Sequence, residues 1–434
     1  MTRSILLIDL IIKSNFSKIG DDMVASILDA ISRIGKTHMQ RDDDMIDKVN
    51  RRYSFIILLL FTVIVSTKQY VGDPIACWTP AQFTGAHVEY ANCICWVSNS
   101  YYINQNVIES SQEQQETDKR NIIPYYQWVP LILPALAFCF YAPGAYWQSF
   151  LRHKGFDMSA IARSIDSIDE MNDDSKDLIT LQAVKHFDRA IKVIRQTADN
   201  CPNRIMKFNA GVSPNYKCID KIIGILKFLQ PNIYSSQNCY QIYKRYLSIK
   251  LVYIMNNAVQ LYLLKFVIGE SYTSLGSDLL NNVIKGEEWK INENFPRVTL
   301  CDFTVRNLAD NNHRHTIQCV LPVNIFNEKI FIFLWFWYSL IIILNLVSIS
   351  RYILYLSPFK RQQFVKKHLD ISDCGQVELE QLRCFINSYL SHDGVLLLRI
   401  LSNNINSIKS SLFIQSLWDN FSMDAKENNV AEIV

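Results

Sequence analysis

Residues 330–352, IFIFLWFWYSLIIILNLVSISRY, decide the fold class of this chain. A helix needs about 20 predominantly apolar residues to cross roughly 30 Å of hydrocarbon, because each residue advances the helix by about 1.5 Å. This run is long enough, and its one charged side chain, Arg351, lies next to its end. We therefore predict a membrane-spanning helix here.

Two other stretches have the same character, and a third is weaker. Residues 53–71 and 125–150 are also long and predominantly apolar. Residues 246–268 are interrupted by Lys250 and other polar side chains, so this run alone could be a buried helix of a soluble protein. We count it as a span, since four crossings leave both hydrophilic ends on one side and polar residues within a membrane usually face a bundle interior or an aqueous path.

The overall composition excludes several classes of protein. Of 434 residues, 49% are hydrophobic and 20% are charged, which does not fit collagen, a disordered tail or a small disulfide scaffold. The net charge of +3 is small and no nucleic-acid-reading motif is present, so no nucleic-acid partner is expected.

The positions of Lys and Arg predict the orientation. Counting Arg351 at the end of the fourth span, 33 of these residues lie in 1–52, 151–245 and 351–434, whereas 8 lie in 70–124 and 269–329. The density is about twofold higher in the first group, and such excess is typical of the cytoplasmic side. Both termini and the middle loop are therefore predicted to be cytoplasmic.

The predicted fold class is an all-α membrane protein, a bundle of four transmembrane helices with a small disulfide-linked extracellular domain and a helical cytoplasmic domain. The cytoplasmic domain is expected to be helical because apolar residues recur every three or four positions between Leu178 and Ile194 and again near Leu382. In chain order the predicted segments are the cytoplasmic N-terminus, 1–52; the first span, 53–71; the first extracellular loop, 72–124; the second span, 125–150; the cytoplasmic loop, 151–245; the third span, 246–268; the second extracellular loop, 269–329; the fourth span, 330–352; and the cytoplasmic C-terminal region, 353–434.

Cysteine positions agree with this topology. The two outer loops contain Cys77, Cys93, Cys95, Cys301 and Cys319, on the side where disulfides form and persist. The other six cysteines fall in the second span or in cytoplasmic segments and are expected to be free thiols. Five outer cysteines leave one unpaired if two bridges form.

Motifs of enzymes are missing from the sequence. There is no phosphate-binding glycine loop, HExxH motif, CxxC pair or nucleophile elbow, so neither catalysis nor a cofactor is expected. His313 and His315 could bind a metal but are more typical of a solvated loop, and residues 42–44 (DDD) lack the rest of a calcium loop. We predict no metal site.

The loop motifs are more specific than the spans. The first outer loop contains CWTPAQF at 77–83, and the second contains FPRVTLCDF at 295–303 and QCVLPVN at 318–324. The second span begins with the motif Tyr125, Tyr126, Gln127, Trp128, Val129 and Pro130. With these motifs in order between four spans, residues 24–355 resemble the innexins, the pannexin-related family of invertebrate gap-junction channel subunits.

The resemblance implies an octameric ring of innexin subunits, homomeric or heteromeric, around an aqueous pore in the plasma membrane. Rings of two apposed cells would dock through their outer loops and pass ions and small molecules; some relatives act undocked, as hemichannels. Residues 24–35 (VASILDAISRIG) have helical spacing that fits a helix on the membrane surface or in a pore mouth. The resemblance favours the pore, and the candidate pore-lining residues are then Val24, Ser26, Ile27, Asp29 and Ala30.

The resemblance also identifies four cysteines as the bonded set. Pairing Cys77 with Cys319 and Cys95 with Cys301 would fasten the two outer loops together twice. Four cysteines allow three pairings, so this one is a hypothesis. Cys93 departs from the family pattern, and we expect it to be a free, buried thiol.

Two other functions compete with a gap junction. A four-span adhesion or scaffold protein of the claudin or tetraspanin type would carry a Gly-Leu-Trp run or a Cys-Cys-Gly motif in its outer loops, and neither is present. A non-junctional hemichannel is the closer alternative. Neither outer loop has an N-glycosylation acceptor that would obstruct docking, which favours the junctional form.

Overall fold

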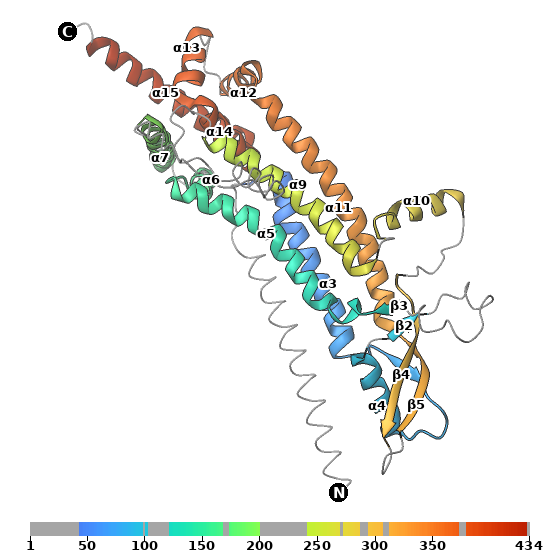
Figure 1. Cartoon of the computed structure of the whole chain (residues 1–434). Helices are drawn as coiled ribbons and strands as arrows, with labels where there is room; N and C mark the ends of the chain where they lie inside the picture. Colours follow the sequence, from blue (N-terminus) through green and yellow to red (C-terminus); the bar gives the residue numbers. More distant parts are fainter. Residues whose placement is uncertain are drawn as a thin grey trace, which may run out of the picture. The chain divides into compact units, whose positions relative to one another are not determined.

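The computed structural model describes nine stretches of the chain (Figure 1), which divide into two compact units. The first unit includes Arg52–Phe140 and Asn256–Ile342, and the second includes Met39–Arg51, Tyr141–Met255 and Ile343–Val434. The described residues are 43–98, 100–102, 121–167, 173–199, 241–269, 272–286, 294–306, 312–372 and 379–431.

Four helical stretches of the described chain are long and apolar enough to cross a membrane. They are Met45–Tyr70, which joins α2 (Met45–Lys48), the π-helical turn η1 (Val49–Tyr53) and α3 (Ser54–Tyr70); α5 (Val129–His153); α9 (Gln241–Ile268); and α11 (Pro322–Tyr355). The predicted fold class, a four-span helical membrane protein, is confirmed.

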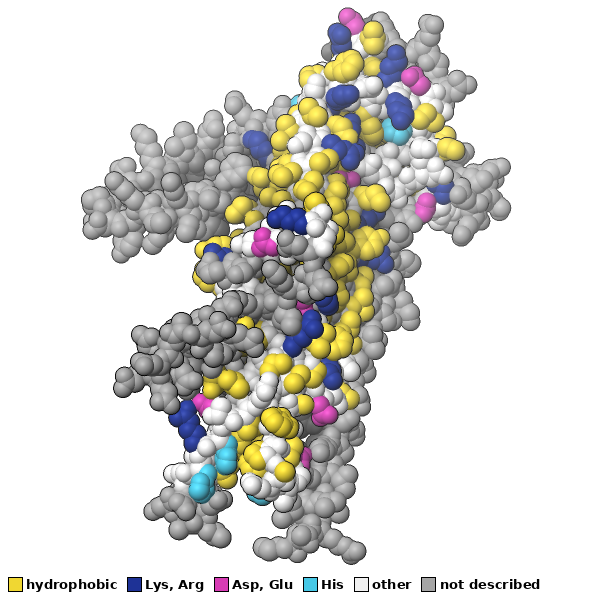
Figure 2. All heavy atoms as spheres, turned by 90° about the vertical axis from the view of Figure 1, so that its right-hand side faces the viewer, with side chains coloured by type: hydrophobic (Ala, Val, Ile, Leu, Met, Phe, Trp, Pro, Cys, Tyr) yellow, Lys and Arg dark blue, Asp and Glu magenta, His cyan; other side chains and the backbone are white. Residues whose placement is uncertain are grey.

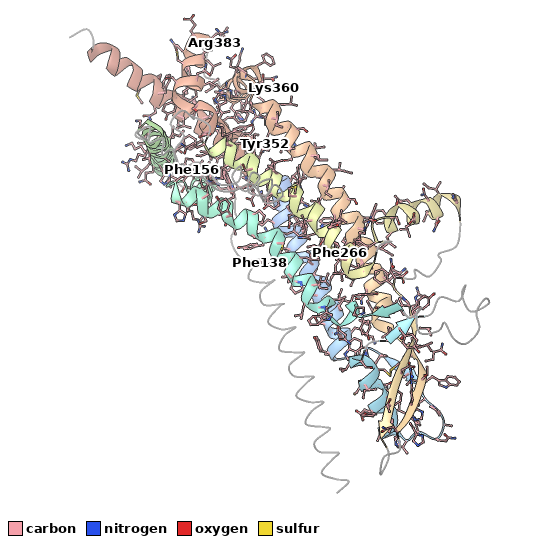
Figure 3. The ribbon with its side chains drawn as sticks, in the orientation of Figure 1. Phe138, Phe156, Phe266, Tyr352, Lys360 and Arg383 are labelled. Atoms are coloured by element: carbon pink, nitrogen blue, oxygen red, sulfur yellow. A yellow bond between two sulfur atoms is a disulfide. The ribbon has the colours of Figure 1, made fainter. Side chains whose placement is uncertain are left out.

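Large apolar side chains on these helices point away from the protein. Phe138 on α5 and Phe266 on α9 are 65% and 68% exposed (Figure 3), an arrangement that leaves them for lipid to cover. The helices α9 and α11 also begin several residues before the predicted spans. The limits of the membrane-embedded parts therefore remain predictions.

The helix α5 begins later than the predicted second span. Residues Tyr125–Gln127 form a short 3-10 turn, η4, and α5 starts only at Val129. Pro130 is then the second residue of the helix, where its missing N–H would have no helical partner in any case.

A five-stranded antiparallel sheet, which the sequence pattern did not predict, belongs to the first unit. Its strands lie in the order β1-β5-β4-β2-β3, so the two strands of the second predicted outer loop lie between strands of the first. Along β4 the side chains of Thr299, Cys301 and Phe303 are buried, as alternation in a strand requires. The strands are β1 (Ala76–Trp78), β2 (Ser100–Tyr102), β3 (Asn121–Ile123), β4 (Val298–Arg306) and β5 (Asn312–Val320), and the unit's two further helices are α4 (Gly85–Val97) and α10 (Leu275–Lys285).

The second unit packs helices of the middle loop against helices of the C-terminal region. Phe187 on α7 contacts Phe156 and, from the C-terminal region, Phe413, with ring centroids 5.2 and 5.7 Å apart. On α7, Val184 and Ile191 are buried with Phe187. The remaining elements are α6 (Met158–Asp166), α7 (Asp173–Asp199), α12 (Pro358–Ile371), α13 (Leu379–Cys384), the π-helical turn η7 (Phe385–Leu390), α14 (Ser391–Asn404) and α15 (Ser407–Ala431).

Candidate functional site

Two disulfide bonds hold the sheet of the first unit together. Cys77 on β1 is bonded to its register partner Cys319 on β5, with an S–S distance of 2.06 Å. Cys95 on α4 is bonded to Cys301 on β4, with an S–S distance of 1.99 Å. The bonded residues are 242 and 206 positions apart in sequence, so each bond restricts a long stretch of the unfolded chain. Together they fix the two predicted outer loops to each other.

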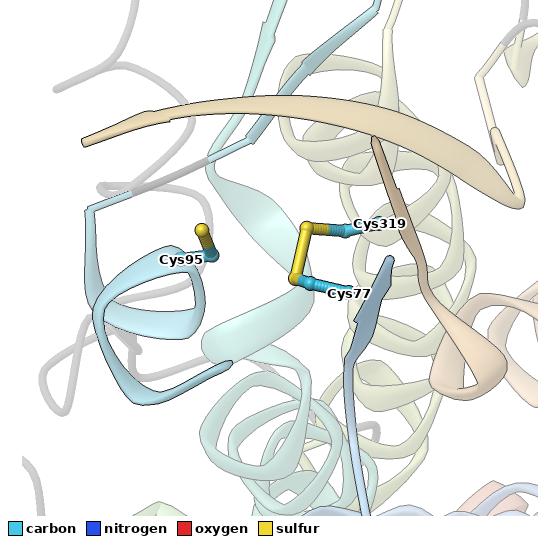
Figure 4. A group of neighbouring side chains, drawn as sticks. All are labelled: Cys77, Cys95 and Cys319. Carbon is cyan, nitrogen blue, oxygen red and sulfur yellow. A yellow bond between two sulfur atoms is a disulfide. The ribbon is translucent and has the colours of Figure 1, made fainter. Parts of the chain in front are cut away.

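The two bonds lie next to each other. Figure 4 shows Cys95 beside the Cys77–Cys319 bond, and these three sulfur atoms lie within 4.8 Å of one another. Three thiolates at this spacing could hold a metal, but sulfur atoms joined in disulfides are not thiolates. Their chemistry here is that of a buried covalent core for a small domain.

Cys93 is free, as expected, but it is exposed, and the expectation that it is buried was wrong. Cys93 and Cys95 are two residues apart on α4, so they point about 200° apart around the helix. Cys95 faces the bonded partner on β4, and Cys93 is therefore turned outward.

The tyrosines of the motif before the second span are buried among parts of both loops. The Tyr125 hydroxyl donates a hydrogen bond of 2.9 Å to the backbone carbonyl of Asn294, and its ring contacts Phe295. Tyr126 is fully buried and packs on Trp96 at the end of α4, with ring centroids 4.9 Å apart. These two residues therefore tie the start of the second span to both outer loops.

The rest of the motif continues this attachment. The Gln127 side chain donates to the backbone carbonyl of Trp96, and the Gln127 carbonyl accepts from the Gln69 side chain at 3.3 Å. Residues 129 and 130 are buried, whereas Trp128 is 58% exposed. All but one of the six motif residues thus have structural roles at the junction of α3, α4 and α5.

A carboxylate, Asp302, braces the exposed side of the β4–β5 hairpin. It accepts hydrogen bonds from Arg314 and Thr316, both at 2.7 Å, and from the Tyr101 hydroxyl at 3.1 Å. Partial burial acts to raise the pKa of Asp302, but the hydrogen bonds from Thr316, Arg314 and Tyr101 lower that pKa below its usual value. The carboxylate is therefore ionised at neutral pH and links β2, β4 and β5.

In the second unit, a fully buried lysine lies at the centre of a charge network. The Lys250 ammonium on α9 is 2.7 Å from Asp47 and 3.5 Å from Asp44. Asp47 also accepts a hydrogen bond of 2.7 Å from the Tyr246 hydroxyl. The Lys250 nitrogen lies 5.1 Å from the ring centroids of Tyr246 and Tyr352. Buried charges are stable only when paired in this way.

The segment 43–51, to which these aspartates belong, makes further buried contacts. Arg51 forms an ion pair of 2.6 Å with Asp43. Asn50 and Asn345 on α11 exchange two side-chain hydrogen bonds of 2.8 and 3.1 Å. Gly144 on α5 makes room for Arg51, because a Cβ atom at residue 144 would lie 2.2 Å from the Arg51 side chain.

The same segment is also tied to α14. Lys48 donates to the side chain of Asn404, whose amide donates to the Asp43 carbonyl at 2.9 Å. Asn403 donates to Asp44 at 3.4 Å. Residues 43–51 are thus fixed to four helices, to α14 and to the parts of α5, α9 and α11 that belong to the second unit.

Sequence reasoning missed this network. It interpreted Lys250 only as an interruption of a weak span, and residues 42–44 only as an incomplete calcium loop. A lysine inside an apolar helix, together with several aspartates just before another span, was the available signal, because a buried ammonium needs an acidic partner.

A second buried carboxylate, Asp393 on α14, caps the beginning of α9. Its two oxygen atoms accept hydrogen bonds from the backbone N–H groups of Ile242, at 3.2 Å, and Tyr243, at 2.9 Å. Burial raises the pKa of Asp393 to about 6, although these hydrogen bonds act to lower it. The carboxylate satisfies N–H groups that have no partner within the helix.

The candidate pore-lining residues lie outside the described residues. They are Val24, Ser26, Ile27, Asp29 and Ala30.

Comparison with known proteins identifies the family. The Innexin family model matches residues 43–421, which extends beyond residue 355, where the sequence resemblance ended. "Innexin unc-9" of Caenorhabditis elegans is 35% identical over 401 residues, covering 90% of this chain and 95% of the relative. "Innexin-11" and "Innexin-3" of the same organism are 31% and 30% identical, covering 90% and 89% of this chain and 81% and 85% of theirs. The chain therefore belongs to the innexin family, whose members form the subunits of gap-junction channels.

Proposed function

We propose that this chain assembles into an octameric ring, alone or with other innexins, and that the ring docks through its outer loops with a ring on the neighbouring cell. The disulfide-fastened sheet is the observation that carries this proposal. A docking surface built from loops must keep one shape without a large core of its own, and two buried disulfides supply that rigidity.

The β4–β5 hairpin is the element best suited to reach the partner ring. It consists of two nine-residue strands that run on beyond the short strands β1, β2 and β3 beside them (Figure 1). Arg314 on this hairpin is 64% exposed while its guanidinium is held by Asp302, so its charge is presented in a fixed position. Fixed, exposed charges favour selective recognition of a partner.

The proposed orientation places both termini and the helices of the middle loop and of the C-terminal region in the cytoplasm, as the Lys and Arg distribution predicts. Residues 24–35 would then form a helix in the pore mouth. The contacts of residues 43–51 with four helices support this role, because a helix that narrows a pore must be anchored where it joins the first span.

The molecule would conduct ions and small molecules and would catalyse no reaction. The family forms channels, and the buried carboxylates described above pair with cations, hydroxyls or backbone N–H groups of the protein itself.

Paired-cell recording tests the junction. We expect conductance between two cells that both express the chain. Membrane current in single cells without conductance between paired cells would indicate an undocked hemichannel. The absence of both would favour an adhesion or scaffold role.

A charge reversal on the hairpin tests the docking surface. Arg314→Glu should abolish conductance between paired cells, because it replaces a fixed positive charge and repels Asp302, while current in single cells persists. Unchanged conductance between pairs would exclude this part of the hairpin from docking.

A further inference from the structure

We propose that α10 is an interfacial helix whose apolar face lies in the outer leaflet of the membrane. This inference goes beyond the channel function, and its test does not depend on conductance. The helix follows the third span closely, because α9 ends at Ile268 and α10 runs from Leu275 to Lys285. Figure 1 shows it projecting sideways from α11.

The sequence of α10 divides cleanly between two faces. At 100° per residue, one side carries the apolar residues Leu275, Leu279, Leu280, Val283 and Ile284, and the other carries the polar residues Ser277, Asp278, Asn281, Asn282 and Lys285. The one acid and the one base cancel, so the helix has no net charge. Such a pattern with no net charge fits an uncharged lipid surface.

The beginning of α10 is fixed against the outer end of the predicted fourth span. The Tyr272 hydroxyl donates to the Phe331 carbonyl at 3.2 Å, and the Trp335 indole donates to the Thr273 carbonyl at 3.1 Å. Gly276 rests on the Trp335 ring, since a Cβ atom there would lie 2.0 Å from it. Residues 331–335 begin the most apolar stretch of α11, so α10 starts at the level where hydrocarbon meets head groups.

The composition of α11 at this level supports the same depth. Trp335, whose indole contacts the start of α10, is of a residue type that is enriched at the boundary between membrane and water. Figure 2 views the side from which α10 projects, and hydrophobic side chains are gathered on this face.

The apolar face of α10 has no protein cover among the described residues. Leu280, Val283 and Ile284 are 48%, 68% and 81% exposed. Three large apolar side chains of one short helix therefore face outward.

A neighbouring subunit is the competing occupant. A stable protein interface needs about 800 Å² and roughly 20 to 30 residues on each side. The exposed apolar face of α10 consists of three side chains, so α10 alone could not hold a neighbouring subunit. Lipid needs no such minimum, because each apolar side chain is covered independently.

Photo-crosslinking in the full-length chain tests the proposal. The photoreactive residue p-benzoylphenylalanine replaces Val283 on the apolar face or, as the matched control, Asn281 on the polar face. Each protein is reconstituted in phosphatidylcholine vesicles and irradiated. Mass spectrometry of the α10 peptide detects lipid adducts, and gel electrophoresis detects adducts between subunits.

The expected result is a phosphatidylcholine adduct at position 283, several-fold more abundant than at position 281. Adducts between subunits that predominate at 283 would assign this face to a neighbouring copy and overturn the proposal. Equal lipid-adduct yields at both positions would show that lipid does not prefer the apolar face, and no adduct at 283 would place α10 in water; either result would overturn the proposal as well. Unaltered assembly of both variants on size-exclusion chromatography establishes that each has folded.

Discussion

Replacing Lys250 with methionine should detach the segment 43–51 from α9. The methionine side chain has a similar length and fills the same space between Tyr246 and Tyr352, so the change removes the charge rather than the packing. Asp47 then loses a cation at 2.7 Å and Asp44 loses one at 3.5 Å, while both carboxylates remain buried.

The cost of this change is large because an unpaired charge stays behind. Breaking a buried ion pair by removing one partner destabilises a protein by about 3–5 kcal/mol. Removing the second charge should recover much of this, so Lys250→Met combined with Asp47→Asn is expected to be more stable than Lys250→Met alone. The asparagine oxygen can still accept the hydrogen bond from Tyr246.

Thermal unfolding of the purified chain in detergent measures the effect, with surface expression as a second measurement. Lys366→Met is the matched control, since Lys366 is exposed on α12 and its replacement should change the free energy of unfolding by at most about 0.5 kcal/mol. The reasoning is refuted if Lys250→Met unfolds at the wild-type temperature, or if the double variant is less stable than the single one.

Three further predictions concern other parts of the molecule. Asp393→Asn should gain stability relative to the wild type as the pH rises from 4.5 to 7.5. The folded-state pKa of Asp393, about 6, lies above the ordinary value of 3.8, so protonation of this carboxyl stabilises the folded wild type. The wild type loses that stability as the pH rises through 6, whereas asparagine does not titrate. Gly276→Val should cost about 1–3 kcal/mol in thermal unfolding, because its side chain would collide with Trp335. Cys95→Ser with Cys301→Ser should cost about 2–5 kcal/mol and abolish conductance between paired cells.

A specific result would contradict each of these predictions. A stability difference between Asp393→Asn and the wild type that does not change with pH would show that the carboxyl titrates normally. If Gly276→Val unfolded at the wild-type temperature, α10 would not rest on α11. Peptide mapping that finds Cys77 joined to Cys95 would reject the disulfide pairing.

The sequence predicts the helices well because length and apolarity alone determine whether a helix can cross a membrane. The stretch 330–352 carries this signal without interruption, and the weaker stretch 246–268 also forms part of a long helix, α9. Its polar residues were a difficulty for the prediction because their partners, such as Asp47 for Lys250, lie about 200 residues away in the chain. Local pattern cannot reveal such pairs.

The sheet escaped prediction for a related reason. Strands β1, β2 and β3 have three residues each, too few for alternation to be recognised, and their pairing joins segments from different loops. The exposure of Cys93 was missed because it depends on α4 being a helix. The two-residue spacing between Cys93 and Cys95 predicts that they lie on opposite faces only when the segment is known to be a helix.

The most direct test of the account is the side of the membrane on which two exposed free thiols lie. Cys93 on α4 and Cys384 on α13 are both free and exposed, and the proposed topology puts them on opposite sides. Intact cells are treated with a membrane-impermeant maleimide, and labelling of each cysteine is measured by peptide mass spectrometry. The account predicts labelling of Cys93 in intact cells and of Cys384 only after permeabilisation; labelling of both, or of Cys384 alone, in intact cells would contradict it.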